Sequence, residues 1–297
     1  MVKNLKLIAT LPNLNYKEKI IRVLECPQVA EVRYNTGTND LMTTKEMLTI
    51  LCMLQETYKK KIWIDLKGRQ LRITKWADPL YEVIELNHEI EVLYPAKIIF
   101  RNGCTSSIVK TRGNKIIVDP IPKEAVGSGQ AVNILARDLD IKGYLTPKDI
   151  EVLSLCKELG LNNIMASFVE EVDDIKAITD ILPEANIISK IESIKGLKFV
   201  RENPGYALMA ARDDLFVELD EEYEIIEGLK DIIKADENAI CASKIFSSLR
   251  KRVTPDLADY SDLEYMQILG FKKFMLDDTI SHHHFEEAVK AWVKVLK

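Results

Sequence analysis

The chain has 297 residues, of which 47% are hydrophobic and 29% are charged, and its net charge is −5. This balance is typical of a folded globular protein, and the absence of a long basic run argues against nucleic-acid and membrane-surface partners. No apolar stretch is long enough to span a membrane, no signal peptide is recognisable, and the five cysteines form no CxxC pair, so we expect a cytoplasmic protein with reduced thiols.

Short β-rich apolar runs alternate with longer helical patterns along most of the chain. Eight strands are expected, over Leu5–Leu11, Ala30–Asn35, Ile62–Lys67, Asn163–Phe168, Ile187–Glu192, Ala207–Asp214, Ala239–Ser243 and Lys273–Asp278. Helical segments between and after them include Thr44–Tyr58, Pro147–Leu159, Val172–Leu182, Glu221–Lys234 and His284–Leu296. Eight such units predict an α/β fold, the (β/α)8 TIM barrel, and an open doubly wound sheet is the less favoured alternative.

One interval interrupts the alternation, because residues 73–140 contain no long helical pattern. Turn signals there separate β-type runs at Tyr81–Leu86, Ile90–Leu93, Lys97–Phe100, Ser107–Lys110 and Lys115–Val118. We predict that residues 73–140 form a small β-rich domain inserted after the third strand, and that residues 1–72 and 141–297 form the barrel. An insert at this end of a barrel is well placed to act as a lid.

Charged residues stand at the ends of the fifth and sixth predicted strands. Lys190 and Glu192 are two positions apart and so face the same side, and Asp214 ends the next strand. Carboxylates from adjacent strands are suitable ligands for a hard divalent cation such as Mg²⁺ or Mn²⁺, and a lysine beside them can neutralise a phosphoryl or enolate oxygen. The alternative interpretation is a structural salt bridge at the barrel mouth.

The second and third predicted strands end in a similar way. Arg33 and Asn35 share one face, and Asp65, Lys67 and, after a turn, Arg72 follow on the next strand. The planar guanidinium group of arginine suits phosphate and carboxylate oxygens. Each residue alone could be a solvated rim charge, but their concentration at strand ends favours an anion site.

Six segments of the chain resemble motifs of the pyruvate kinase family, in the same order. Trp63–Arg72 is similar to the family's LDTKGPEIR, Val32–Asn35 to ARLNFSHG, Ile187–Glu192 to IISKIEN and Met165–Phe168 to ASFIR. Met209–Leu219 is similar to MVARGDLGIEI, and Cys241–Asp262 to CATQMLESM…PTRAEVSD. The resemblance covers the barrel and, through Asn114–Asp119, part of the insert.

The resemblance implies roles for the residues that match these motifs. Glu192 and Asp214 would hold Mg²⁺, Lys190 would stabilise the transferring phosphoryl group, Arg33 would bind phosphate, and Arg72 would be a second active-site arginine. Asn35 and Asp65 would ligate K⁺. Asp213, Ser167, Lys67 and Asp256 occupy further positions near the substrate. These roles agree with the chemistry of phosphoryl transfer, which needs positioning and charge neutralisation.

The sequence departs from the family pattern at several of these places. Asp256 stands where the family has the threonine of PTRAE, and Asp213 and Phe216 replace the two glycines of GDLG. The K⁺ site has Leu66 in place of a threonine. The sequence also ends after the eighth predicted helix, so we expect neither the family's C-terminal domain nor its effector site. An extra anion at Asp256 would repel an anionic substrate.

Three functions are consistent with these features. The first is Mg²⁺-dependent phosphoryl transfer between phosphoenolpyruvate and ADP or another nucleoside diphosphate. The second is a metal-dependent lyase or aldolase that acts through a pyruvate enolate, and the third is a non-catalytic relative that binds phosphoenolpyruvate or pyruvate. The resemblance also allows a homo-oligomer.

Six remaining residues near the predicted mouth are open to more than one interpretation. Asp277 and Asp278 either extend the acidic mouth or cap the last helical region. Cys241 is more consistent with a buried small residue than with a nucleophile. His282–His284 could touch a metal or phosphate, but solvated surface residues are the favoured interpretation.

Overall fold

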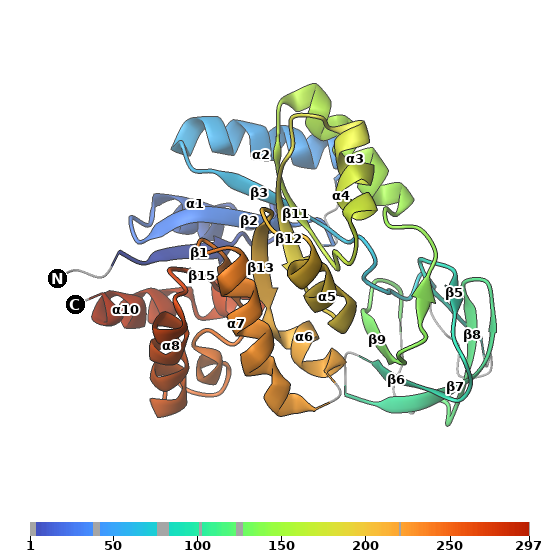
Figure 1. Cartoon of the computed structure of the whole chain (residues 1–297). Helices are drawn as coiled ribbons and strands as arrows, with labels where there is room; N and C mark the ends of the chain where they lie inside the picture. The colour runs from blue at the N-terminus through green and yellow to red at the C-terminus, as the bar shows by residue number, and fades with distance from the viewer. Residues whose placement is uncertain are drawn as a thin grey trace. The chain divides into compact units, whose positions relative to one another are not determined.

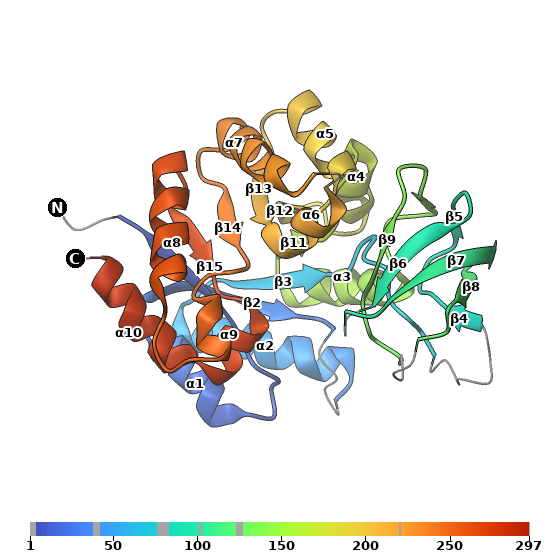
Figure 2. The same cartoon turned by 90° about the horizontal axis from the view of Figure 1, so that it is seen from below.

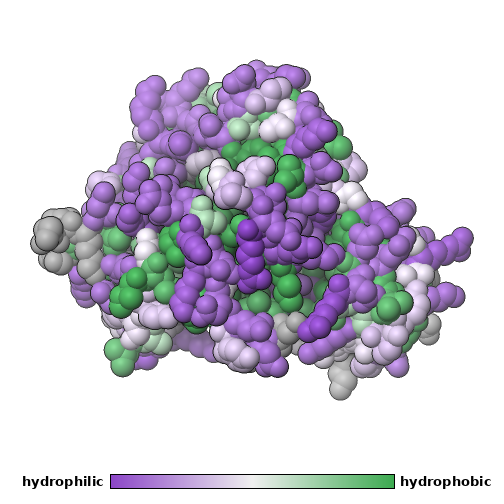
Figure 3. Space-filling model, in the orientation of Figure 1, coloured by the Kyte–Doolittle hydropathy of each residue, from purple (hydrophilic) through white to green (hydrophobic). Residues whose placement is uncertain are grey.

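A computed structural model describes residues 4–37, 42–75, 83–100, 103–122, 127–219 and 221–296. The chain divides into two compact units, one of residues 1–66 and 150–297 and the other of residues 67–149. No helix within the described residues is both long and apolar enough to cross a membrane. On the face seen in Figure 3, hydrophilic residues predominate between separate smaller groups of hydrophobic ones.

The first unit contains a closed barrel of eight parallel strands, which confirms the predicted TIM barrel. Each strand pairs with its neighbours along the chain, and the last strand pairs with the first. The barrel strands are β1 (Lys6–Thr10), β2 (Val29–Asn35), β3 (Ile62–Leu66), β11 (Asn163–Ala166), β12 (Asn186–Ile191), β13 (Ala207–Ala211), β14 (Ile240–Ala242) and β15 (Lys273–Met275).

Helices surround these strands (Figures 1 and 2). They are α1 (Lys17–Glu25), α2 (Thr44–Tyr58), α3 (Pro147–Leu159), α4 (Val172–Ile181), α5 (Ile194–Glu202), α6 (Arg212–Glu218), α7 (Ile225–Ala235), α8 (Leu257–Leu269), α9 (Asp278–His283) and α10 (Phe285–Val295). Two short 3₁₀ turns, η1 (Glu222–Glu224) and η2 (Ser247–Arg250), precede α7 and α8.

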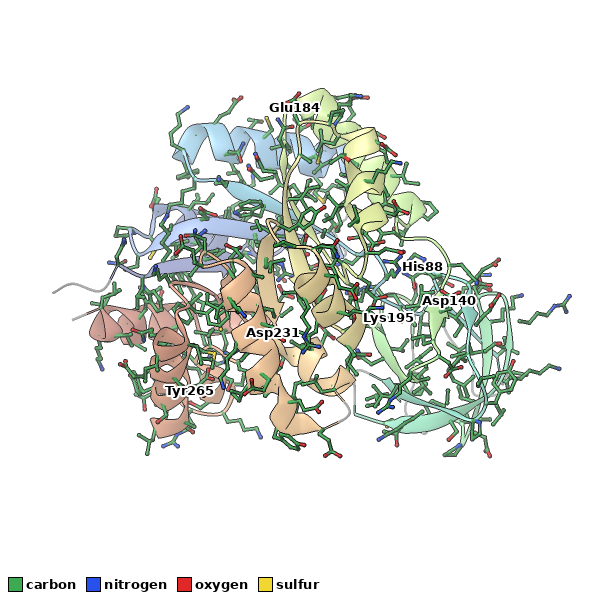
Figure 4. All side chains as sticks on the ribbon, viewed as in Figure 1. His88, Asp140, Glu184, Lys195, Asp231 and Tyr265 are labelled. Carbon is green, nitrogen blue, oxygen red and sulfur yellow. The ribbon has the colours of Figure 1, made fainter. Side chains whose placement is uncertain are left out.

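Local sequence signals set the ends of these helices. At the start of α2, the Thr43 hydroxyl accepts a hydrogen bond from the Glu46 N–H, and the Glu46 carboxylate accepts one from the Thr43 N–H at 2.8 Å. This reciprocal capping satisfies N–H groups that have no partner inside the helix. On the outer ring, Asp231 of α7, labelled in Figure 4, pairs with Arg201 of α5 at 2.7 Å.

Two predicted strands were wrong at their C-terminal ends, because each included the start of the next helix. Lys273–Asp278 forms a strand only to Met275, and α9 begins at Asp278. The run Ala207–Asp214 forms a strand only to Ala211, and α6 begins at Arg212. Two consecutive acidic residues then occupy the first helical turn, where the helix dipole favours negative charge. The change from strand to helix alters the direction of the Asp213 and Asp214 side chains.

The second unit is built on antiparallel sheets. Its larger sheet has the order β4 (Val83–Glu85), β8 (Lys115–Asp119), β7 (Thr105–Arg112), β6 (Ala96–Phe100) and β9 (Val132–Leu135), and β5 (Ile90–Glu91) pairs with β10 (Asp140–Ile141). Tyr81 and Glu82, at the start of a predicted strand, lie outside the described residues. The buried face of the larger sheet forms a hydrophobic core of its own. His88, labelled in Figure 4, is buried in this unit, and its Nε2 lies 2.9 Å from the Gly68 carbonyl oxygen.

Candidate functional site at the barrel mouth

The inside of the barrel carries an apolar layer with a polar layer above it. Ile8, Trp63, Met165, Ile188, Met209, Ile240, Ala242 and Met275 form one buried cluster. Two positions further along four of these strands, where alternation returns a side chain to the same face, stand Thr10, Asp65, Ser167 and Lys190. All four are buried. The polar residues therefore lie over a hydrophobic floor at the C-terminal ends of the strands.

Lys190 is the centre of this polar layer. Its Nζ donates a hydrogen bond to Ser167 Oγ at 2.7 Å and forms ion pairs with Asp65 Oδ1 at 3.3 Å and Glu192 Oε1 at 3.2 Å. Burial alone would lower the pKa of Lys190, but the carboxylates of Asp65 and Glu192 outweigh it and raise that pKa. The side chain is therefore a fixed cation at neutral pH.

Arg33 is a second buried cation beside Asp65. Its Nε donates to Asp65 Oδ2 at 2.9 Å, its Nη2 donates to the same oxygen, and its Nη1 donates to Thr10 Oγ1 at 3.1 Å. The same Nη1 donates to Asp278 Oδ1 at 2.9 Å. Although burial opposes charge, these carboxylates raise the pKa of Arg33.

Glu192 and Asp214 are the predicted metal ligands. Glu192 Oε1 faces Lys190, and Oε2 accepts a hydrogen bond from the Phe168 N–H at 2.8 Å. Asp214 lies in the first turn of α6, half-buried, and its charge contributes to the raised pKa of Lys190. The prediction that Asp214 lies on a strand was wrong. The charge of its carboxylate nevertheless acts on Lys190.

The carboxylates at the mouth suit Mg²⁺ better than a metal whose ligands must all come from protein side chains. Within the described ranges, no three His, Cys, Asp or Glu side chains gather as a metal site. Mg²⁺ is commonly held by one or two carboxylates, with waters and substrate oxygens as its other ligands. Glu192 and Asp214 can supply such a pair, so the residues present fit the ion.

The predicted K⁺ ligands have protein partners in this structure. Asp65 faces both Arg33 and Lys190, so two protein cations balance its charge. The Asn35 Oδ1 accepts the Gly37 N–H at 3.0 Å, and its Nδ2 donates to Asp278 Oδ2 at 3.1 Å. A K⁺ role for Asn35 and Asp65 stays a prediction.

Two predicted substrate residues lie in other local networks. Asp213 pairs with Lys244 at 2.6 Å. Asp256 is the N-cap of α8, where its carboxylate accepts the Asp259 N–H at 3.2 Å. The capping interaction gives Asp256 a structural role that the motif comparison did not indicate.

Lys67 and Arg72 belong to the second unit. The Lys67 N–H donates to Asp149 Oδ1 at 2.9 Å, and Arg72 donates to the Gln70 side chain through Nε at 3.0 Å. Their predicted contacts with a substrate stay predictions.

The structure shows where several residues that the sequence left open near the last strand lie, and a contact of His282–His284 with a metal or phosphate stays a prediction. Asp278 joins the mouth through Arg33 and Asn35, whereas Asp277 caps α9 and pairs with Arg250 at 2.7 Å. His282 lies near the C-terminal end of α9, where its Nε2 lies 3.1 Å from the Leu11 carbonyl oxygen. Burial raises the pKa of Cys241 to about 11, which agrees with a buried residue and not with a nucleophile.

Thr10 is a mouth residue that the sequence analysis did not name. The alternation signal that indicated Arg33 and Asn35 was also present for Thr10, which stands two positions after the inward-facing Ile8. For Asp278 the sequence left a mouth position and a helix cap open, because its partner Arg33 is 245 positions away in the chain.

The fold and the mouth define a TIM-barrel protein with buried cations and carboxylates at the C-terminal ends of its strands. A family model described as the barrel domain of pyruvate kinase matches residues 96–286, more than half of the chain. The chain belongs to the pyruvate kinase family.

Curated relatives agree with this assignment. The chain is 28% identical to pyruvate kinase PKLR of Homo sapiens, in a match that covers 75% of the chain and 42% of the human protein. It is 27% identical to pyruvate kinase of Methanocaldococcus jannaschii over 100% of the chain and 70% of that protein, and 24% identical to that of Borreliella burgdorferi over 98% and 67%. The chain thus spans less than half of the human relative and about two thirds of the other two.

Proposed function

We propose that the protein catalyses Mg²⁺-dependent phosphoryl transfer between phosphoenolpyruvate and a nucleoside diphosphate. The observation that carries this proposal is that two buried cations, Lys190 and Arg33, share the carboxylate of Asp65 at one barrel mouth, where Glu192 pairs with Lys190 and the charge of Asp214 acts on it. Phosphoryl transfer depends mainly on positioning and on neutralising charge, and these residues supply both.

In this proposal Arg33 and Lys190 act through their positive charges. Arg33 binds the phosphate of phosphoenolpyruvate, and Lys190 stabilises the phosphoryl group as its bond to the enolate oxygen breaks and its bond to the nucleotide forms. Ser167 and Asp65 hold the Lys190 ammonium group in place. Mg²⁺ bound by Glu192 and Asp214 would neutralise negative charge on substrate oxygens.

The charge balance of the mouth supports a need for the metal. Arg33 and Lys190 stand among four carboxylates, those of Asp65, Glu192, Asp214 and Asp278. These carboxylates repel an anionic substrate, and a divalent cation bound beside them would offset that repulsion. We therefore expect phosphoenolpyruvate to bind more tightly when Mg²⁺ or Mn²⁺ is present.

A coupled assay tests this function directly. Phosphoenolpyruvate, ADP, Mg²⁺ and K⁺ are supplied, and pyruvate formation is followed. We expect pyruvate above background, and we expect Lys190→Met to reduce its rate by at least about a hundredfold because the charge on the transferring group is no longer stabilised. Lys198→Met, which removes an exposed lysine of α5, is the matched control. No pyruvate from a wild-type protein that is folded by circular dichroism would overturn the proposal.

A second candidate is a lyase or aldolase that forms a pyruvate enolate without a nucleotide. The altered residues Asp213, Phe216 and Asp256 are the observation in its favour, since they change the region that matches the family's substrate-carboxylate site. Exchange of the pyruvate methyl protons in deuterated water, followed by NMR, separates the two. Metal-dependent exchange without turnover of phosphoenolpyruvate and ADP would support the second candidate.

A further inference from the structure

Asp278 is the most exposed of the three residues that bind the Arg33 side chain. Arg33 has five N–H donors, and four are used by Asp65, Thr10 and Asp278. The fifth is on Nη2. Bidentate binding of a phosphate through the end of a guanidinium group needs one donor from Nη1 and one from Nη2. Arg33 can reach that arrangement only if Nη1 releases one of its present partners.

Burial decides which partner can leave. Thr10 is 0% exposed, and the Asp65 side chain is 1% exposed, so neither can be replaced from solvent without opening the barrel. The Asp278 side chain is 41% exposed and is carried by the short helix α9. A ligand that enters from the mouth therefore meets Asp278 first.

The Asp278 carboxylate also accepts a hydrogen bond from Asn35. Asp278 Oδ2 accepts from the Asn35 Nδ2, while the Asn35 Oδ1 accepts the Gly37 N–H and so keeps the amide group turned toward Asp278. If Asp278 moved away, one Nη1 donor of Arg33 would lose its present acceptor. A phosphate group can accept from that donor.

We propose that Asp278 is a specificity-determining residue. Its carboxylate occupies an Nη1 donor of Arg33 and must be displaced by the phosphate of the ligand. The inference rests on the proposed role of Arg33 in phosphate binding. It predicts that Asp278 weakens the binding of phosphate-bearing ligands much more than the binding of anions that lack a phosphate group.

The test compares the affinities of phosphoenolpyruvate and pyruvate, measured by calorimetry in the presence of Mn²⁺. We expect Asp278→Asn and Asp278→Ala to bind phosphoenolpyruvate about tenfold more tightly than the wild type, because a charge-assisted contact no longer competes for Arg33. Pyruvate affinity should increase much less, because pyruvate carries a negative charge but no phosphate group that could replace Asp278 on Arg33. A merely structural role would lower the unfolding temperature and would not increase affinity for one ligand alone.

Asp277→Asn is the matched control, because it removes the same charge one position away and asparagine remains a good N-cap for α9. Arg33→Met tests the proposed phosphate role of Arg33 separately from the inference about Asp278. If Arg33→Met weakens phosphoenolpyruvate binding but the Asp278 variants bind it no more tightly than the wild type, the inference about Asp278 is wrong while the Arg33 site stands. If Arg33→Met binds phosphoenolpyruvate as the wild type does, both the inference and the proposed phosphate role fail.

Discussion

At the scale of single residues, the protonation state of Lys190 limits the chemistry of the mouth. A lysine that forms a Schiff base with a carbonyl substrate needs a lowered pKa, so that its amine is neutral. Asp65 and Glu192 have the opposite effect on Lys190, whose pKa is raised. The contacts thus favour a charge-stabilising role and disfavour an imine mechanism.

This leads to a prediction about covalent trapping. When the protein is incubated with pyruvate and borohydride at about pH 7 to 9, below the raised pKa of Lys190, we expect no reduced adduct on that residue. Peptide mass spectrometry gives the measurement, and the exposed Lys198 gives the background level of surface labelling. Labelling of Lys190 above that background would contradict the assignment of a permanent cation.

At the scale of secondary-structure elements, Asp256 is a helix cap in a place where the family motif has threonine. Its side chain and that of Asp259 form a reciprocal cap at the start of α8, and Asp256 also lies 3.8 Å from Arg252. Threonine is a good N-cap as well, whereas alanine is not. Residue 256 can therefore be negatively charged or neutral without loss of the N-cap of α8.

Two substitutions distinguish the contribution of the capping hydrogen bond to stability from that of the negative charge. We expect Asp256→Ala to lower the free energy of unfolding by about 1 kcal/mol, and Asp256→Thr to change it much less, because only the alanine variant loses the cap. Urea unfolding measures both values. Equal destabilisation by the two variants would show that the carboxylate charge, and not the capping bond, stabilises the start of α8.

Sequence reasoning predicted the parts of the site that follow from strand alternation. Lys190, Glu192, Arg33 and Asn35 each share a face with the residue two positions away, and the structure brings them to one mouth. Alternation failed where a strand ended early, as at Ala211, because Asp214 then follows helical geometry. It also could not place Lys67 and Arg72, which follow the end of β3 and lie in the second unit.

At the scale of the whole molecule, the barrel brings together residues that are far apart in the chain. Arg33 from β2 meets Asp65 from β3 and Asp278 from α9, and Lys190 from β12 meets Asp65 as well. The apolar layer below these groups keeps water from their inner side, which strengthens the interactions between their charges. The closed barrel thus creates a charged site that no single segment contains.

Calorimetric titration with Mn²⁺ shows whether this mouth binds a divalent cation through Glu192 and Asp214. We expect Glu192→Gln and Asp214→Asn each to weaken Mn²⁺ binding by at least about tenfold, since each removes one anionic oxygen ligand. Asp213→Asn, which removes the neighbouring acid that pairs with Lys244, should bind Mn²⁺ as the wild type does. Wild-type affinity in both ligand variants would instead make the cluster a structural salt-bridge network.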